Sequence, residues 1–84
     1  MSAVVVRARF DSATLESTDP WKVRKGDLGV LKWKAHRRHA RFFEPHVVWD
    51  RDPKRRMRKV IVSSIAIAGL QTSASRVLLL RLLR

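Results

Sequence analysis

Hydrophobic and polar side chains alternate at the start of the chain. Every second position from Val4 to Phe10 is apolar, whereas Arg7 and Arg9 fall on the opposite side. This period of two predicts a β-strand over residues 3–10. Because one strand cannot pair its own backbone groups, it must pair with a distant segment of the chain or with another chain.

Further along, apolar positions recur at steps of three and four residues. They are Leu28, Leu31, Ala35, His39 and Phe42. This spacing places them on one side of a helix, so the sequence predicts a basic helix over residues 28–43, which Pro45 ends. Gly29 is unfavourable in a helix, and a hairpin at residues 25–27 followed by a strand at residues 28–33 is the alternative.

A second basic helix is predicted over residues 53–68. Asp52 can cap free N–H groups, Pro53 fits the first helical turn, and Gly69 stops the helix. Many residues in this segment are β-branched, which leaves a buried strand over residues 60–67 as the alternative.

Leucines dominate the last stretch of the chain. Thr72 or Ser73 can cap a helix that runs to Arg84, with leucines on one side and arginines on the other. The patterns together predict a mainly α fold: a short N-terminal strand, two basic helices joined by a Pro-bounded elbow, and a C-terminal amphipathic helix. With 84 residues the chain (1–84) is one small domain, extended and stabilised by assembly.

Charge changes the picture more than any other feature of the composition. Nineteen Lys and Arg against seven Asp and Glu give a net charge of +12, and residues 22–59 hold fourteen of the bases and four of the acids, a net +10. A compact fold with this charge repels itself unless a polyanion supplies counter-charge. The absence of Cys excludes disulfides and thiolate metal sites.

Aromatic rings accompany the charge between residues 32 and 59. Cations that neutralise phosphates, beside rings that can stack on bases, suit RNA. Phe42 and Phe43 are expected to pack in the core, whereas Trp33 and Trp49 lie off the apolar stripes and are the better stacking candidates. The predicted RNA contacts are Lys32, Lys34, Arg37, Arg38, Arg41, Lys54, Arg55, Arg56, Arg58, Lys59, Trp33 and Trp49.

This pattern divides the domain into three regions. Residues 1–19 form an extended docking arm, residues 20–59 a basic region that faces RNA, and residues 60–84 an apolar docking tail. Such a division is typical of a small protein that is held between RNA and protein neighbours.

Other chemistry finds little support in the sequence. His36, His39 and His46 suggest a metal site, but their cationic neighbours disfavour a divalent ion. Asp50 and Asp52 only superficially form a carboxylate pair, because an arginine separates them. With no Gly-rich phosphate loop, nucleophile elbow or Cys–His pair, the sequence predicts no enzyme, metal or cofactor.

Several short motifs follow one another in a defined order along the chain. They are Val4-Val5-Val6-Arg7, Gly29-Val30-Leu31, Arg37-Arg38, Arg41-Phe42-Phe43-Glu44-Pro45 and Lys54-Arg55-Arg56. In this order the chain resembles the S-twenty-one family of small-subunit ribosomal proteins. The resemblance implies helices that lie on ribosomal RNA, with Arg37, Arg38, Arg41 and Arg55 facing it. The apolar tail after Lys59 departs from the family pattern.

The sequence thus predicts a structural constituent of an organellar ribosome. Its partners are ribosomal RNA and neighbouring ribosomal proteins, and its location is the mitochondrion, which an N-terminus with arginines and no acids before Asp11 favours. One alternative is an accessory subunit of an inner-mitochondrial-membrane complex, because residues 60–80 are apolar over nearly a spanning length. A free basic peptide that binds nucleic acid is a second alternative.

Overall fold

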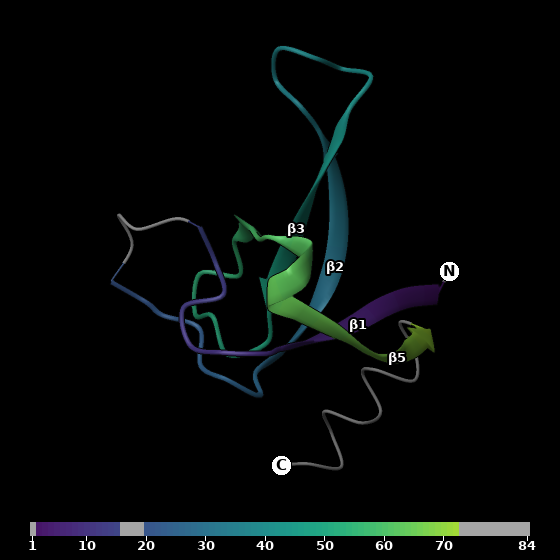
Figure 1. Cartoon of the computed structure of the whole chain (residues 1–84). Coiled ribbons are helices and arrows are strands. Elements are labelled where there is room, and N and C mark those ends of the chain that lie inside the picture. Colours follow the sequence, from purple (N-terminus) through teal and green to yellow (C-terminus); the bar gives the residue numbers. More distant parts are fainter. Residues whose placement is uncertain (1, 16–19, 73–84) are drawn as a thin grey trace.

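The computed structural model describes residues 2–15 and 20–72. These residues form five β-strands and one short 3-10 helix. The elements are β1 (Ser2–Ala8), β2 (Leu28–Ala35), β3 (Phe43–Trp49), β4 (Met57–Lys59), η1 (Val62–Ser64) and β5 (Ile65–Thr72). All five strands belong to one antiparallel sheet in the order β4-β3-β2-β1-β5 (Figure 1).

The prediction of a mainly α fold is therefore wrong. Strand β2 and the turn that leads to β3 lie where the helix over residues 28–43 was expected, and β4, η1 and the start of β5 replace the helix over residues 53–68. The alternative strand at residues 28–33 is confirmed by β2, and the alternative strand at residues 60–67 overlaps β5. The predicted C-terminal helix lies outside the described residues.

Segment β2 satisfies two periodicities at once. Leu28 and Leu31 fit a helical step of three, but Leu31 and Trp33 also fit the period of two that a strand requires. The strand forms because β2 pairs with β1 on one edge and with β3 on the other. These ladders satisfy its backbone groups and let its apolar side chains pack against the core. Long-range pairing, which local periodicity does not encode, thus determines the fold.

Pro45 lies inside β3 and does not end an element, contrary to expectation. Its carbonyl oxygen accepts a hydrogen bond from the backbone N–H of Val60 at 3.1 Å. In an antiparallel strand the N and O atoms of one residue point to the same edge, so the position without an N–H faces away from β2. The β2–β3 ladder therefore passes Pro45 without losing a hydrogen bond.

The predicted N-terminal strand is confirmed as β1, and its partners are distant segments of the same chain. Val5, Val6 and Arg7 pair with β2 on one edge, while the whole strand pairs with β5 on the other. The register with β5 shifts between Val5 and Val6, which marks a bulge. Neither edge of β1 is open between Val5 and Arg7.

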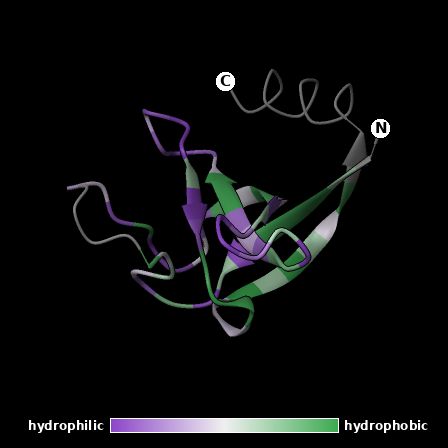
Figure 2. Cartoon of the chain, turned by 90° about the horizontal axis from the view of Figure 1, so that it is seen from above, coloured by the Kyte–Doolittle hydropathy of each residue, from purple (hydrophilic) through white to green (hydrophobic). Residues whose placement is uncertain are grey.

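The hydrophobic core lies between the sheet and the long loop that joins β1 to β2. Its buried members are Val6, Ala8, Ala13, Val23, Val47, Trp49 and Val60. Ala13 and Val23 come from that loop, which bonds to itself through Ser12 N–H and Val23 O at 2.9 Å. Leu15 N–H donates to the carbonyl oxygen of Lys59 at 2.9 Å, so the loop also closes over β4. Hydrophobic residues follow the strands, and most connecting loops are hydrophilic (Figure 2).

Gly29 is required where β2 and β3 meet above the core. A Cβ at this position would lie 2.5 Å from Val47 Cγ1 and 2.8 Å from the carbonyl oxygen of Val48. Gly29→Ala should therefore force the strands apart and lower the free energy of unfolding by about 1–3 kcal/mol, a loss that thermal denaturation can measure.

Gly69→Ala is the matched control for this prediction. A Cβ at Gly69 meets nothing within 4 Å, so the same change there should leave the melting temperature nearly unchanged or slightly higher. Equal losses in the two variants would contradict the steric explanation.

The membrane alternative concerned residues 60–80. Up to Thr72 this segment runs through η1 and β5, and β5 is hydrogen-bonded to β1 within the sheet. In the part of the chain that the structure describes, no helix has the length and apolarity needed to cross a bilayer.

Candidate nucleic-acid interface

Strands β2 and β3 extend beyond the other strands as a two-stranded hairpin. β1 faces β2 only as far as Val30, and β4 faces β3 only from His46 to Val48. The outer ladder consists of the pairs Trp33↔Pro45, Lys34↔Glu44 and Ala35↔Phe43. We call residues 32–46 the basic hairpin. It projects from the body of the protein, with its tip at the top of Figure 1.

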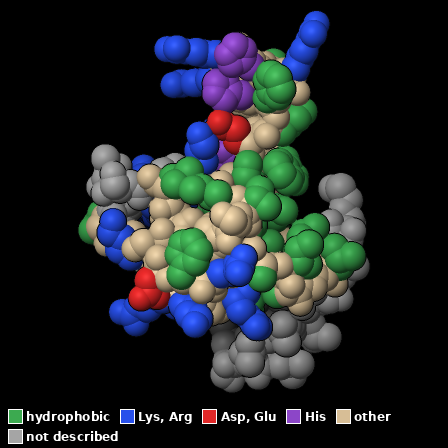
Figure 3. Space-filling model, viewed as in Figure 1, with side chains coloured by type: hydrophobic (Ala, Val, Ile, Leu, Met, Phe, Trp, Pro, Cys, Tyr) green, Lys and Arg blue, Asp and Glu red, His purple; other side chains and the backbone are tan. Residues whose placement is uncertain are grey.

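The two faces of the basic hairpin differ in chemistry. Residues that pair directly across an antiparallel ladder point to the same face. One face carries Leu31, Trp33, Ala35, Phe43, Pro45 and Val47, and the other carries Lys32, Lys34, Glu44 and His46. Because Val47 belongs to the core and Leu31 packs against it, the apolar face continues the core face outward beyond the core. Hydrophobic side chains run down the hairpin toward the body in Figure 3.

Aromatic side chains of the hairpin are exposed. Trp33 is 57% exposed, Phe42 67% and Phe43 61%. The expectation that Phe42 and Phe43 pack in the core is therefore wrong. Phe42 meets the His39 ring edge-on, with 6.3 Å between ring centroids, so it belongs to the tip of the hairpin.

His36 organises the turn at the tip. Its backbone N–H donates to Phe42 O at 2.8 Å, and its Nδ1 accepts from the backbone N–H groups of Arg38 at 3.1 Å and His39 at 3.3 Å. An accepting Nδ1 places the ring proton on Nε2 in the neutral imidazole. With the turn held by its backbone, the exposed guanidinium groups at the tip belong to Arg37, Arg38 and Arg41.

One acid, Glu44, lies among the five Lys and Arg of the basic hairpin. Lys59 Nζ on β4 is 3.0 Å from Glu44 Oε1, and His36 Nε2 is 3.6 Å from the same oxygen. The hydrogen bond from Lys59 holds the pKa of Glu44 below its ordinary value, although slight desolvation opposes this. Because Lys59 neutralises this carboxylate, Glu44 does not cancel the positive charge of the hairpin.

Two of the predicted RNA contacts are buried. Trp49 lies in the core and Arg58 is fully enclosed, each with 0% exposure. Arg58 Nε donates to Asp52 Oδ2 at 2.8 Å, and its guanidinium lies 5.0 Å from the centroid of the Trp21 ring. These two buried side chains therefore stabilise the fold and are not available to contact RNA.

Of the remaining predicted contacts, Lys59 lies on β4 beside Glu44, and the others separate into two groups at opposite ends of β3. Lys54, Arg55 and Arg56 are exposed in the β3–β4 loop, whereas the hairpin residues lie beyond the other end of that strand. Asp52, expected as a helix cap, shapes this loop instead by accepting from the backbone N–H groups of Lys54 at 2.9 Å and Arg56 at 3.2 Å. The structure thus brings together the contacts between Lys32 and Arg41 and sets the second group apart.

Comparison of the chain with protein-family models, with curated proteins and with solved structures returned no match. The likeness to the S-twenty-one family therefore stays a prediction, and the α-helices that it implied are absent from residues 2–15 and 20–72. Within the same residues, no group of three or more His, Cys, Asp or Glu could hold a metal ion. The function must be argued from the geometry of the basic hairpin itself.

Two carboxylates make the stability of the fold depend on acid pH. The side-chain hydrogen bonds from Arg51 to Asp27, at 2.8 and 2.9 Å, lower the pKa of Asp27. Burial raises the pKa of Asp52, but the hydrogen bonds from Arg58 and two backbone N–H groups outweigh burial and leave the pKa below its ordinary value. Both groups stabilise the folded state when ionised, so their contribution is complete above about pH 4 and is lost as pH falls through the folded pKa.

We expect the ionisation of Asp27 and Asp52 to leave the urea midpoint of unfolding constant from about pH 7 to 5. Below about pH 4 the midpoint should fall steadily. Asp27→Asn should lower the midpoint at neutral pH and flatten the fall in acid. An Asp27→Asn profile parallel to that of the unaltered chain would contradict this role for Asp27.

Proposed function

We propose that this chain is a non-enzymatic RNA-binding protein whose basic hairpin contacts RNA phosphates. The observation that carries the proposal is the content of residues 32–46: five Lys and Arg, one acid, and exposed Trp and Phe side chains on a two-stranded projection. Phosphate contacts by Lys and Arg supply most of the affinity of such interfaces, and they make it depend on salt.

The hairpin contributes little to the stability of the isolated chain. Its outer pairs lie beyond β1 and β4, and its large aromatic side chains stay in contact with water. Trp33 is 57% exposed, so more than half of its surface gains nothing from folding, whereas that surface gains on contact with a ligand. The composition of the hairpin is therefore better explained by binding than by folding.

The setting that we propose is an organellar ribosome, with ribosomal RNA and neighbouring ribosomal proteins as partners. A net charge of +12 on 84 residues requires a polyanion nearby, and ribosomal RNA is an abundant one. The proposed mitochondrial location rests on the N-terminal arginines and the absence of acidic residues before Asp11. RNA binding by the hairpin can be tested without knowing the setting.

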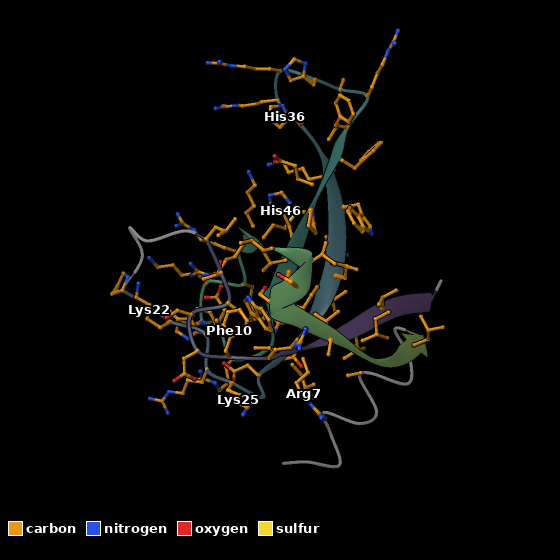
Figure 4. All side chains as sticks on the ribbon, viewed as in Figure 1. Arg7, Phe10, Lys22, Lys25, His36 and His46 are labelled. Carbon is orange, nitrogen blue, oxygen red and sulfur yellow. The ribbon has the colours of Figure 1, made fainter. Side chains whose placement is uncertain are left out.

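The test compares two double variants that remove the same charge. Arg37→Ala/Arg38→Ala alters the hairpin tip, and Lys22→Ala/Lys25→Ala alters exposed residues of the β1–β2 loop. Lys22 and Lys25 lie on the body of the protein, away from His36 near the hairpin tip (Figure 4). Fluorescence anisotropy with a labelled single-stranded RNA, repeated at several salt concentrations, gives the affinity and its salt slope.

We expect the affinity of the full chain to fall steeply with salt. The tip variant should bind at least about tenfold more weakly at low salt, because hydrogen bonds to charged groups contribute about 1.5–3 kcal/mol each, whereas the loop variant should change little. Affinity that does not depend on salt, or equal losses in the two variants, would refute binding through the hairpin.

A further inference from the structure

The apolar face of the basic hairpin carries two exposed rings, those of Trp33 and Phe43. Trp33 pairs with Pro45, and Phe43 pairs with Ala35 one step further out on the same face. Successive same-face positions along a strand are about 7 Å apart, and diagonal neighbours of this kind are within reach when one of them is aromatic. Trp33 and Phe43 thus lie at diagonal positions on one exposed face, with the small side chain of Ala35 directly across from Phe43.

The cations lie around this surface and not on it. Lys32 and Lys34 point from the opposite face, and Arg37, Arg38 and Arg41 are exposed at the tip. The ribbon is two strands wide, about 5 Å between strand axes, so long basic side chains can reach past its edges. A ligand that fits has flat apolar groups in its middle and negative charges along its border.

We propose that the aromatic face of the hairpin stacks unpaired RNA bases on Trp33 and Phe43, so that the ligand is single-stranded RNA. The inference rests on the proposed RNA-binding function and adds the form of the RNA. Unpaired bases offer flat faces to aromatic rings while their phosphates turn outward toward Lys and Arg. Loops, bulges and ends of a folded RNA have such bases.

Double-stranded RNA does not fit the same surface. Its bases are stacked on one another, and its major groove is too deep and narrow for side chains to read. A duplex could meet the Lys and Arg side chains of the hairpin but would leave the rings of Trp33 and Phe43 against water. The aromatic face therefore adds affinity for single strands alone.

The experiment uses the full chain and three probes of matched charge at one salt concentration. These are a twelve-nucleotide oligouridylate, an RNA duplex, and inorganic polyphosphate, which has no bases. The variants are Trp33→Ala, Trp33→Phe and Trp33→Leu, with Phe43→Ala as a second site. Trp33 is exposed, and Trp49 and Trp21 remain in place, so thermal denaturation should find all four variants folded.

Trp33→Ala and Phe43→Ala should each weaken oligouridylate binding about 5- to 150-fold, as expected for the loss of one stacked base. Their affinity for polyphosphate should stay within about twofold of the unaltered chain. Trp33→Phe should bind nearly as well as Trp33, whereas Trp33→Leu, which keeps apolar bulk without a π face, should resemble Trp33→Ala. Quenching of tryptophan fluorescence by oligouridylate should disappear in Trp33→Phe.

Two outcomes overturn the proposal in ways that can be told apart. If the chain binds the duplex as tightly as oligouridylate, or if Trp33→Ala and Trp33→Leu bind oligouridylate normally, stacking is refuted while RNA binding by the hairpin stands. The aromatic face would then be a surface for a protein. If none of the three polyanions binds with salt-dependent affinity, the proposed function itself fails.

Discussion

Replacing Asp52 with Ala should remove a large share of the stability of the fold. We expect the free energy of unfolding to fall by about 3–5 kcal/mol, because the change leaves the buried charge of Arg58 without its carboxylate. A domain of this size has only about 5–10 kcal/mol in total. Circular dichroism during thermal denaturation should show a melting temperature lower by at least about 12 °C.

The size of the expected loss follows from the position of the pair. The side chains of Asp52 and Arg58 are both 0% exposed, and Arg58 Nε lies 2.8 Å from Asp52 Oδ2. Asp52 also accepts from backbone N–H groups on both its oxygens, so one residue neutralises a buried cation and fixes the β3–β4 loop. Burying Arg58 against Trp21 is tolerable only with that carboxylate in place.

Three further variants separate the charge from the loop geometry. Asp52→Asn keeps oxygen and loses charge, so its stability should lie between those of the unaltered chain and Asp52→Ala. The double variant Asp52→Leu/Arg58→Met removes both charges and should recover much of the loss. Glu44→Gln, which alters a surface ion pair, should leave the melting temperature nearly unchanged. An Asp52→Ala chain as stable as Glu44→Gln would contradict the buried-pair account.

Replacing residues 37–41 by Asn-Gly should abolish most RNA binding without unfolding the protein. The substitution joins His36 to Phe42, which are already linked by a 2.8 Å backbone hydrogen bond, through a two-residue turn that hairpins favour. It removes Arg37, Arg38 and Arg41. We expect single-stranded RNA to bind about 100- to 1,000-fold more weakly, with the magnitude of the salt slope lower by about 2.

The matched control for the shortened tip keeps its length and charge. Arg37→Lys/Arg38→Lys/Arg41→Lys retains three cations but loses the forked guanidinium, so it should lose affinity by a much smaller factor. Melting temperatures of the shortened chain and the control should both stay near that of the unaltered chain, because the core lies at the base of the hairpin. RNA affinity that survives the shortening would place the contacts elsewhere.

Sequence patterns were sufficient for β1 and insufficient for the rest of the sheet. The N-terminal alternation is unambiguous, and β1 begins and ends within two residues of the predicted strand. In β2 the same residues fit steps of two and of three, and the choice depended on ladders with two other segments, β1 and β3. Pro45 concealed β3, because proline was expected to end an element. In the fold its missing N–H costs no ladder hydrogen bond, because that position faces away from β2.

The residues of the candidate site could be predicted from the sequence, but their exposure could not. A cluster of cations and rings between residues 32 and 41 is visible in the sequence, whatever its secondary structure. Which side chains reach the surface depends on the fold: Trp49 and Arg58 are buried, while Phe43 is exposed. Burial of Arg58 could not be foreseen from an arginine-rich segment, because it requires Asp52 and Trp21 to meet there. Alternation of apolar and basic residues from Leu31 to Ala35 was a local signal of a strand in this segment.

The most direct test of RNA binding by the basic hairpin is to map the contact on the full chain. Backbone amide resonances, followed by two-dimensional NMR during titration with a twelve-nucleotide single-stranded RNA, report each residue separately. We predict that the largest shift changes fall within residues 32–46 and decrease as salt is added. Changes confined to residues 54–56 or to β5, with the hairpin unaffected, would contradict the account.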